Sequence, residues 1–194
     1  MESSHPPLLL ASESRYKQKL FHRLGLPFHS QAPSLNEDRL PEEAPLAMAI
    51  RLAGNKALAI RPDHPDAFIV AADQVISLES RIFHKPGTRE SAIAQLLALQ
   101  GQTHTLITAV ALSLPSGPLL EAQVIFEMEM RPLSPSEIAA YIDQDTPFDC
   151  AGSYKIEAAG IRLFRNTRGP DPSAIEGLPL TRVWALLEEG GYFL

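Results

Sequence analysis

The sequence has very few of the residues on which disulfide and zinc frameworks depend. Cys150 is its one cysteine in 194 residues, which excludes an internal disulfide framework and best fits a reducing, cytosolic compartment. The six histidines are scattered along the chain, and no cysteine and histidine spacing typical of structural zinc is present. We therefore expect a fold that neither disulfides nor zinc hold together.

The sequence also lacks an apolar stretch of bilayer length. The run Leu8-Leu9-Leu10-Ala11 is far too short for a signal or a membrane span, and no cationic segment precedes it. Seventeen Lys and Arg against 23 Asp and Glu give a net charge of −6, whereas a duplex-DNA binder needs a concentrated basic surface. We expect a cytoplasmic protein that binds neither membranes nor nucleic acid.

Three familiar catalytic motifs are missing as well. The chain has no Gly-x-Ser-x-Gly elbow, no Walker loop and no dinucleotide-binding glycine fingerprint. It also has no internal repeats, heptads or low-complexity segments. The sequence therefore does not indicate a serine hydrolase with a nucleophile elbow or a Walker-type phosphate-binding loop. Any catalytic site must be built from a different set of residues.

What the sequence does contain is an alternation of strand and helix patterns. Short apolar runs predict strands at 8–11, 27–30, 68–76, 102–114, 119–130 and 161–164. Helical spacing and capping residues predict helices at 12–24, 44–60, 88–99 and 134–141 and a closing helix around Val183, Trp184 and Leu187. This alternation favours an α/β architecture with a mixed sheet. At 45% hydrophobic residues, the chain is typical of one two-lobed domain over residues 1–194.

The strand at 68–76 carries the most unusual residue of the chain. Asp73 and Gln74 interrupt a run of apolar and β-branched side chains. A lone charge in a buried strand is costly, so we expect Asp73 to lie at an open end of the strand or to have partners. Lys85, followed by Pro86, supplies a cation a short turn downstream.

Acids, lysines and hydroxyls on several loops accompany Asp73. The set is Ser12, Ser14, Lys17, Glu37, Lys56, Asp73, Lys85 and Glu157. Phosphate chemistry needs this mixture, because lysines neutralise non-bridging oxygens while carboxylates hold a hard cation or activate water. Each residue alone also has an ordinary structural interpretation, such as a serine cap or, for Lys56, a solvated side chain. The nearby Glu42 and Glu43 are interpreted as charges in the first turn of a helix, which the helix dipole favours.

Seven motifs in order give a stronger indication. They are Leu10-Ala11-Ser12-Glu13-Ser14, Arg51-Leu52-Ala53-Gly54-Asn55-Lys56-Ala57, Ala72-Asp73-Gln74-Val75, Lys85-Pro86, Gly101-Gln102-Thr103-His104, Ala151-Gly152-Ser153-Tyr154 and Gly177-Leu178-Pro179. In order and approximate spacing they resemble the Maf family of nucleoside triphosphate pyrophosphatases over nearly the whole chain. The resemblance implies a Maf/HAM1-like (inosine triphosphate pyrophosphatase-like) fold, with a curved mixed sheet and two lobes around a cleft. Homodimers are common in that family.

Further details resemble the branch of this family that hydrolyses 7-methyl-GTP. The dTTP and UTP branch carries Asp-Thr after the central strand and an arginine pair in the first loop, where this chain has Asp73-Gln74 and Tyr16. An aromatic face can stack on a cationic methylated purine, and Glu157 can accept from the guanine edge. The chain departs from the family at Arg15, where a proline is usual, and at Lys17, which lacks the bidentate fork of arginine.

The resemblance implies a role for each candidate. Asp73 is the proton acceptor that activates water and, with Glu37, the ligand of a divalent cation, Mg²⁺ or Mn²⁺, and Lys85 completes the catalytic group. Ser12, Ser14, Lys17 and Lys56 would bind the triphosphate, and Tyr16, Gln74 and Glu157 would select the base. Two alternatives stay open: a dTTP/UTP pyrophosphatase of the same fold and a nucleotide-binding regulator without turnover.

Overall fold

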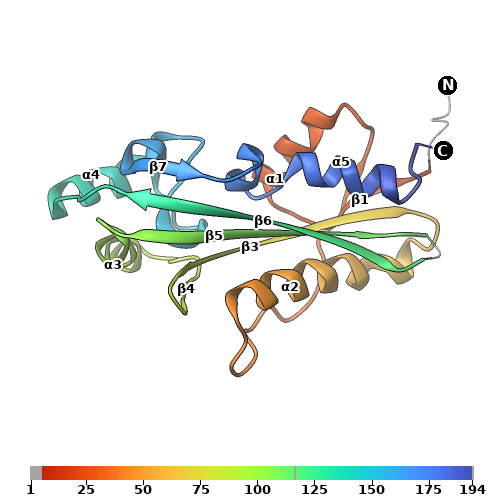
Figure 1. The fold of residues 1–194 in the computed structure, drawn as a ribbon, viewed down its shortest axis with the longest axis horizontal. Helices are drawn as coiled ribbons and strands as arrows, with labels where there is room; N and C mark the ends of the chain where they lie inside the picture. The colour runs from red at the N-terminus through yellow and green to blue at the C-terminus, as the bar shows by residue number, and fades with distance from the viewer. Residues whose placement is uncertain (1–5, 116, 194) are drawn as a thin grey trace. The chain divides into compact units, whose positions relative to one another are not determined.

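The computed structural model describes residues 6–115 and 117–193 as an alternation of strands and helices (Figure 1). The strands are β1 (Leu8–Leu10), β2 (His29–Ser30), β3 (Phe68–Leu78), β4 (Arg81–Phe83), β5 (Thr103–Ser113), β6 (Leu119–Met130) and β7 (Phe164–Arg168). The α-helices are α1 (Arg15–Phe21), α2 (Pro45–Ile60), α3 (Arg89–Leu99), α4 (Pro135–Asp145) and α5 (Leu180–Glu189). Short 3-10 helices are η1 (His22–Leu24), η2 (Arg61–Asp63), η3 (Ala151–Ser153), η4 (Ala159–Leu163) and η5 (Pro172–Glu176).

The strands form one mixed sheet in the order β2-β1-β3-β5-β6-β7, with β4 paired to β3. β1 runs parallel to β2 and to β3, where Leu8 pairs with Phe68. β4 returns antiparallel along the end of β3, and β7 pairs antiparallel with β6. These pairings confirm the predicted α/β class with a mixed sheet.

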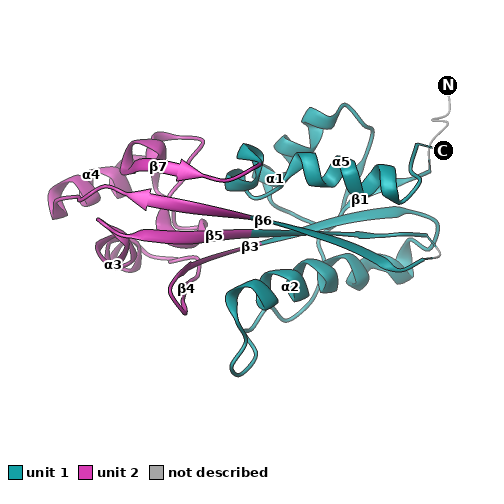
Figure 2. Ribbon diagram, in the orientation of Figure 1, with its two compact units in different colours: residues 1–73, 108–124, 171–194 teal, residues 74–107, 125–170 magenta. Residues whose placement is uncertain are grey.

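The chain divides into two compact units (Figure 2). Unit 1 comprises Met1–Asp73, Thr108–Val124 and Asp171–Leu194, and unit 2 comprises Gln74–Ile107 and Ile125–Pro170. The long strands β3, β5 and β6 each contribute residues to both units. That residues 1–194 behave as a single domain stays a prediction.

Unit 1 has a core of aliphatic and aromatic side chains from β1, β3, α1 and α5. Leu10, Phe21 and Leu187 are fully buried within it, and the rings of Phe68 and Tyr192 meet edge to face with centroids 5.2 Å apart. Burying each large apolar side chain contributes about 2 kcal/mol. This core fixes β1 and β3 side by side, and the residues that follow or interrupt those strands are therefore held in place.

Unit 2 packs α3 against α4, and both helices begin as the sequence indicates. The Thr88 hydroxyl accepts from the Ser91 N–H at the start of α3, and Ser134 and Glu137 form a complete capping box on α4. Leu96 and Leu99 of α3 are fully buried. The capped helices support the loop that follows α4.

Three local predictions are wrong. Residues 159–163 form η4, so the strand begins only at Phe164, because the apolar run at 161–164 is too short to separate a strand from a helical turn. No acid occupies the first turn of α2, since the helix starts at Pro45, after Glu42 and Glu43. Trp184, which the helical spacing predicts on the apolar side of the closing helix with Val183 and Leu187, is 38% exposed: its ring lies beside Phe193, and its indole N–H donates to Glu188.

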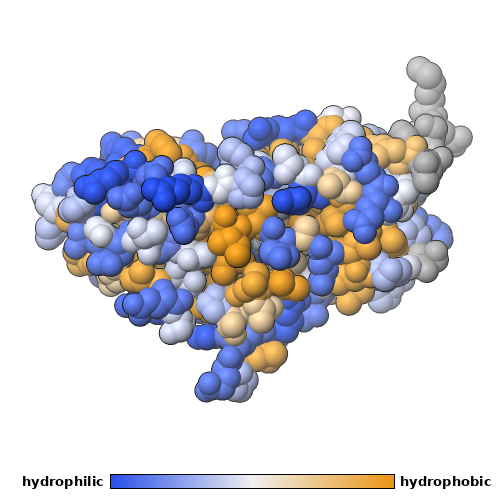
Figure 3. Space-filling view, in the orientation of Figure 1, coloured by the Kyte–Doolittle hydropathy of each residue, from blue (hydrophilic) through white to orange (hydrophobic). Residues whose placement is uncertain are grey.

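The surface mixes hydrophilic and hydrophobic residues, and the most hydrophilic ones gather over α4 and β7 (Figure 3). On β7, Arg165 and Arg168 form ion pairs with Glu129 and Glu127 of β6 at 3.4 and 3.9 Å. Within residues 6–115 and 117–193, no helix is long and apolar enough to span a membrane.

Candidate active site

Asp73 and Lys56 form a buried ion pair in unit 1. Asp73 lies in the middle of β3 rather than at its end, and the Lys56 Nζ from α2 donates to its Oδ1 at 2.5 Å. Their side chains are 10% and 11% exposed. The cost of a charge within an apolar strand is thus offset by a partner, the second of the two possibilities predicted for Asp73.

Glu37 brings a second carboxylate to the same ammonium group. Its Oε2 lies 3.1 Å from the Lys56 Nζ, and its side chain is 55% exposed. Burial alone would lower the pKa of Lys56, but the charges and hydrogen bonds of Asp73 and Glu37 outweigh burial and raise this pKa above 10.5. Lys56 therefore stays charged between two carboxylates, and the interpretation of Lys56 as a solvated surface lysine is wrong.

Lys17 connects α1 to the strand that carries Asp73. Its Nζ donates to the carbonyl oxygen of Ala72 at 2.6 Å, one peptide away from Asp73. Nearby, Ser14 is the N-cap of α1 and accepts from the Lys17 N–H at 3.4 Å, while the Ser12 hydroxyl accepts from the Ser14 N–H at 3.1 Å. The two hydroxyls organise this turn as the capping interpretation predicts, and Lys17 places a cation beside the Asp73 backbone.

The remaining candidates are divided between the units. Tyr16 is half-buried on α1 of unit 1. Gln74, Lys85 and Glu157 belong to unit 2, where Gln74 is half-buried on β3 and the other two are exposed in loops. The residues that the structure brings together are therefore Asp73, Lys56 and Glu37, with Lys17 on the adjoining peptide.

The loop that leads to Glu157 is fixed by buried polar contacts within unit 2. The Tyr154 hydroxyl and the His104 Nε2 are 3.0 Å apart, the Tyr141 hydroxyl accepts from the Lys155 N–H at 2.9 Å, and Ser153 donates to Gln95 at 2.7 Å. His104 is 1% exposed. Burial lowers its pKa to about 4, so this histidine is neutral near pH 7.

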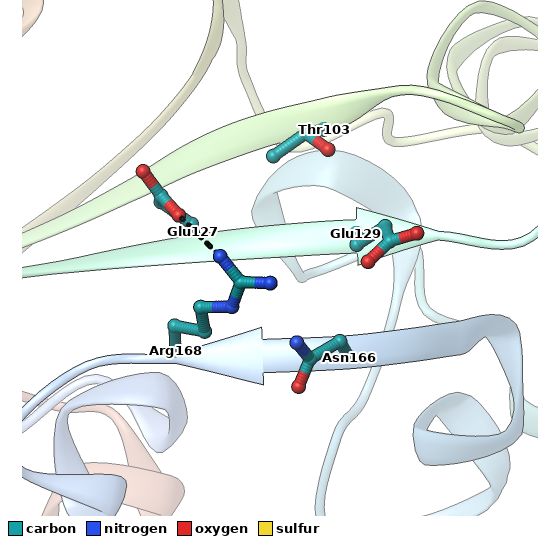
Figure 4. A pocket seen from close by; sticks show the side chains of 5 residues that line it. All are labelled: Thr103, Glu127, Glu129, Asn166 and Arg168. Atoms are coloured by element: carbon teal, nitrogen blue, oxygen red, sulfur yellow. Dashed lines mark ion pairs between the residues drawn. The ribbon is translucent and has the colours of Figure 1, made fainter.

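A shallow polar pocket on the sheet face of unit 2 contains none of the predicted site residues. Its walls are the side chains of Thr103, Glu127, Glu129, Asn166 and Arg168 (Figure 4). Arg168 points toward Glu127, with which it forms the 3.9 Å ion pair. Its charged side chains already form ion pairs, Glu127 with Arg168 and Glu129 with Arg165, and we assign the pocket no part in catalysis.

Two residues near the site were missed as functional candidates. Glu43 and Arg51 form a bidentate ion pair with N–O distances of 2.5 and 2.7 Å. Glu43 precedes α2 and Arg51 lies within it, so no helical spacing relates the two residues and the contact could be found only in the folded chain. The pair flanks the loop of Glu37, which links it to the candidate site.

The Asp73 and Glu37 carboxylates also fit a hard divalent cation. Glu37 Oε2 and Asp73 Oδ1 lie 3.1 and 2.5 Å from the same nitrogen, so two carboxylates of the kind that hard cations prefer meet at this point. Among the described residues no group of three or more His, Cys, Asp or Glu side chains could hold a metal alone. Mg²⁺ is usually bound by one or two carboxylates together with water and substrate phosphates, which matches this pair.

Comparisons with known proteins show to which family this chain is similar. A family model described as Maf-like protein matches residues 7–190. The 7-methyl-GTP pyrophosphatase of Xanthomonas campestris pv. campestris is 42% identical over 189 residues, covering 97% of this chain and 98% of the relative. The 7-methyl-GTP pyrophosphatase of Nitrosococcus oceani is 40% identical, covering 96% and 94%.

Among solved structures, a dITP/XTP pyrophosphatase from Mycobacterium abscessus matches with a TM-score of 0.44 and 16% identity, covering 66% of this chain and 75% of that one. The match of the family model to residues 7–190, together with relatives about 40% identical over nearly the full chain, shows the family. This chain belongs to the Maf family.

Proposed function

We propose that the protein is a nucleoside triphosphate pyrophosphatase that hydrolyses 7-methyl-GTP to 7-methyl-GMP and pyrophosphate, removing a modified nucleotide from the pool. The observation that carries this proposal is the 42% identity, over 97% of the chain, to a relative named 7-methyl-GTP pyrophosphatase. The grouping of Asp73, Glu37 and Lys56 supports it, because phosphoryl transfer is catalysed chiefly by positioning and by charge stabilisation.

In this proposal Asp73 accepts the proton of the attacking water. The water oxygen bonds to the α-phosphorus, the bond from the α-phosphorus to the bridging oxygen breaks, and pyrophosphate leaves with the electron pair. Lys56, held by its ion pairs at 2.5 and 3.1 Å, supplies fixed positive charge for the phosphate oxygens. Lys17 and Lys85 are proposed to neutralise further oxygens, and Ser12 and Ser14 to donate hydrogen bonds to them.

The divalent cation, Mg²⁺ or Mn²⁺, would be held by Asp73 and Glu37 together with phosphate oxygens. When bound, it would supply charge neutralisation at the triphosphate. Glu37 is more than half exposed, so its carboxylate is accessible to a cation or a nucleotide that enters from solvent.

The choice of base is assigned to Tyr16, Gln74 and Glu157. Tyr16 offers an aromatic face for the cationic methylated purine, and the Gln74 amide and Glu157 carboxylate can pair with the guanine edge. The cytoplasmic location and the possible homodimer stay predictions.

A substrate panel tests the proposal. The purified protein is incubated with 7-methyl-GTP, GTP, UTP or dTTP, with Mg²⁺ and separately with Mn²⁺, and pyrophosphate release is measured. We expect 7-methyl-GTP to give the highest kcat/KM. Preferred turnover of dTTP or UTP would instead assign the protein to the dTTP/UTP branch, and nucleotide binding without any product would support a regulator.

A further inference from the structure

The loop that carries Glu37 leads directly into α2 (orange in Figure 1). Glu37 contacts Lys56 from a side chain that is 55% exposed. An ion pair at such a position contributes little to holding a loop, because solvent screens it and the side chain loses entropy. The placement of Glu37 beside Asp73 therefore depends on the rest of the loop.

A cluster of three residues closes this loop, and we call Arg39, Glu43 and Arg51 the Arg51 clasp. Arg51 Nε donates to Glu43 Oε1 at 2.5 Å, and Arg51 NH2 donates to Glu43 Oε2 at 2.7 Å. The same NH2 group donates to the carbonyl oxygen of Asp38 at 3.0 Å. Arg51 thus joins α2 to the peptide immediately after Glu37.

Further hydrogen bonds, each to or from the backbone of Leu40 or Glu43, complete the closure of this loop. Arg39 donates twice to the Glu43 carbonyl oxygen, at 2.8 and 2.6 Å. The Leu40 N–H donates to Glu43 Oε2 at 3.1 Å, and the Glu43 N–H donates to the Leu40 carbonyl at 3.2 Å. Residues 39–43 are therefore fixed by hydrogen bonds that converge on Glu43, and Arg51 holds the adjoining carbonyl of Asp38.

Arg39 is exposed, whereas the Glu43 and Arg51 side chains of the clasp are largely shielded from solvent. The Glu43 side chain is 7% exposed and the Arg51 side chain 22%. Hydrogen bonds from Arg51, the main cause, hold the pKa of Glu43 near 2, so the carboxylate is ionised throughout the neutral range. The planar guanidinium of Arg51 donates to both carboxylate oxygens of Glu43 and to the Asp38 carbonyl oxygen. A lysine ammonium cannot reproduce this bidentate geometry.

We propose that Arg51 and Glu43 are positioning residues for the hydrolysis: they hold residues 38–43 closed and thereby keep the Glu37 carboxylate beside Lys56 and Asp73. The inference rests on the proposed function for the reaction it serves, and it assigns no contact between the clasp and the substrate. Outer partners of this kind, when removed, typically reduce metal affinity or activity by about 10- to 100-fold.

The test is a double-mutant cycle of Arg51→Lys and Glu37→Gln, with kcat and KM measured for pyrophosphate release from 7-methyl-GTP. We expect Arg51→Lys to lower kcat/KM by about 10- to 100-fold. In the Glu37→Gln background the same change should cost less than about threefold, because residues that act through one another are not additive. A structural role independent of Glu37 would give the same factor in both backgrounds.

A second measurement follows the loop without using activity. Hydrogen exchange of the Leu40 and Glu43 amides should accelerate at least about tenfold in Arg51→Lys, since both amides depend on the clasp. Arg89→Lys is the matched control, because Arg89 forms a bidentate pair with Asp143 in unit 2 at 2.6 and 2.8 Å. It should leave loop exchange unchanged and kcat/KM within about twofold, as expected of an exposed pair.

The outcomes separate this inference from the function on which it rests. Unchanged loop exchange in Arg51→Lys, or faster exchange with kcat/KM still at the wild-type value, would overturn the positioning role. If the wild-type protein prefers another nucleotide of the panel, the base assignment fails and the cycle is measured with that nucleotide. If it hydrolyses none of them, both proposals fall together.

Discussion

Lys56 is the cation that joins the two carboxylates of the candidate site: its side chain is 11% exposed and contacts both Asp73 and Glu37. A lysine near the edge of an apolar helical face is usually solvated. Whether it is buried depends on Asp73, a residue 17 positions away on another element. Sequence spacing within α2 contains no information on that partner, so the pair could be found only in three dimensions.

Removing the cation from this pair should destabilise the protein. Lys56→Met leaves Asp73 buried without its partner, and we expect the free energy of unfolding to fall by about 3–5 kcal/mol, the range found for broken buried pairs. Urea unfolding measures the loss. In the double variant Lys56→Met/Asp73→Asn no buried charge remains, so most of the stability should return; a double variant as unstable as Lys56→Met would refute this account.

His104 should make stability depend on pH below neutrality. Its pKa is lowered by burial from 6.5 to about 4, so between these values the unfolded chain binds more protons than the folded protein. Stability from this group is therefore full above pH 6.5 and is lost as pH falls toward 4, by about 3 kcal/mol in total. Thermal melting from pH 7 to 4 should show this slope, and His104→Gln should reduce it. An equally steep slope in the variant would exclude His104 as its source.

At the scale of elements, the loop before Tyr154 depends on a glycine. Gly152 has φ +69°, and a Cβ there would lie 2.8 Å from the Cδ1 of Ile76. Gly152→Ala should therefore cost about 1–3 kcal/mol, from backbone strain plus displacement of Ile76. The control is Gly87→Ala, because Gly87 has φ +71° with nothing within 4 Å of the added Cβ. Chemical denaturation should show the larger loss for Gly152→Ala; equal losses would mean that the contact with Ile76 contributes nothing.

Elements with strong local signals were predictable from the sequence. Thr88 and Ser134 begin α3 and α4 through side-chain caps, where the sequence predicts the start of these helices. The segment 159–168 was not, because its short apolar run fits a strand and a helical turn equally well. Glu43 was taken for a helix-dipole charge because its partner Arg51 approaches only when the chain folds back on α2.

At the scale of the molecule, the mixed α/β sheet and the family followed from the sequence, because strand and helix patterns and seven motifs extend over the whole chain. The assembly of the candidate site did not follow. Asp73, Lys56 and Glu37 converge within unit 1, whereas Gln74, Lys85 and Glu157 belong to unit 2. Motif order specifies which residues to expect but not which side chains share a contact.

The proposed division of roles predicts a separation of kinetic effects. Substituting Tyr16→Ala in unit 1 should raise the KM for 7-methyl-GTP by about tenfold, since stacking and cation–π contacts contribute about 1–2 kcal/mol. The kcat/KM for GTP, which lacks the methyl cation, should change less. Steady-state kinetics with both nucleotides measures the difference, and an equal effect on the two would remove Tyr16 from base selection.

Pyrophosphate release from 7-methyl-GTP by the wild-type protein and by Asp73→Asn tests the central claim most directly. The variant keeps the shape of the side chain but loses the carboxylate that accepts the proton, so general-base catalysis of about 10²- to 10⁴-fold should be lost. Circular dichroism verifies that it is folded. We predict rapid release by the wild type with Mg²⁺ or Mn²⁺ and a fall in kcat of at least about 100-fold in Asp73→Asn; a folded variant with undiminished turnover would contradict the account.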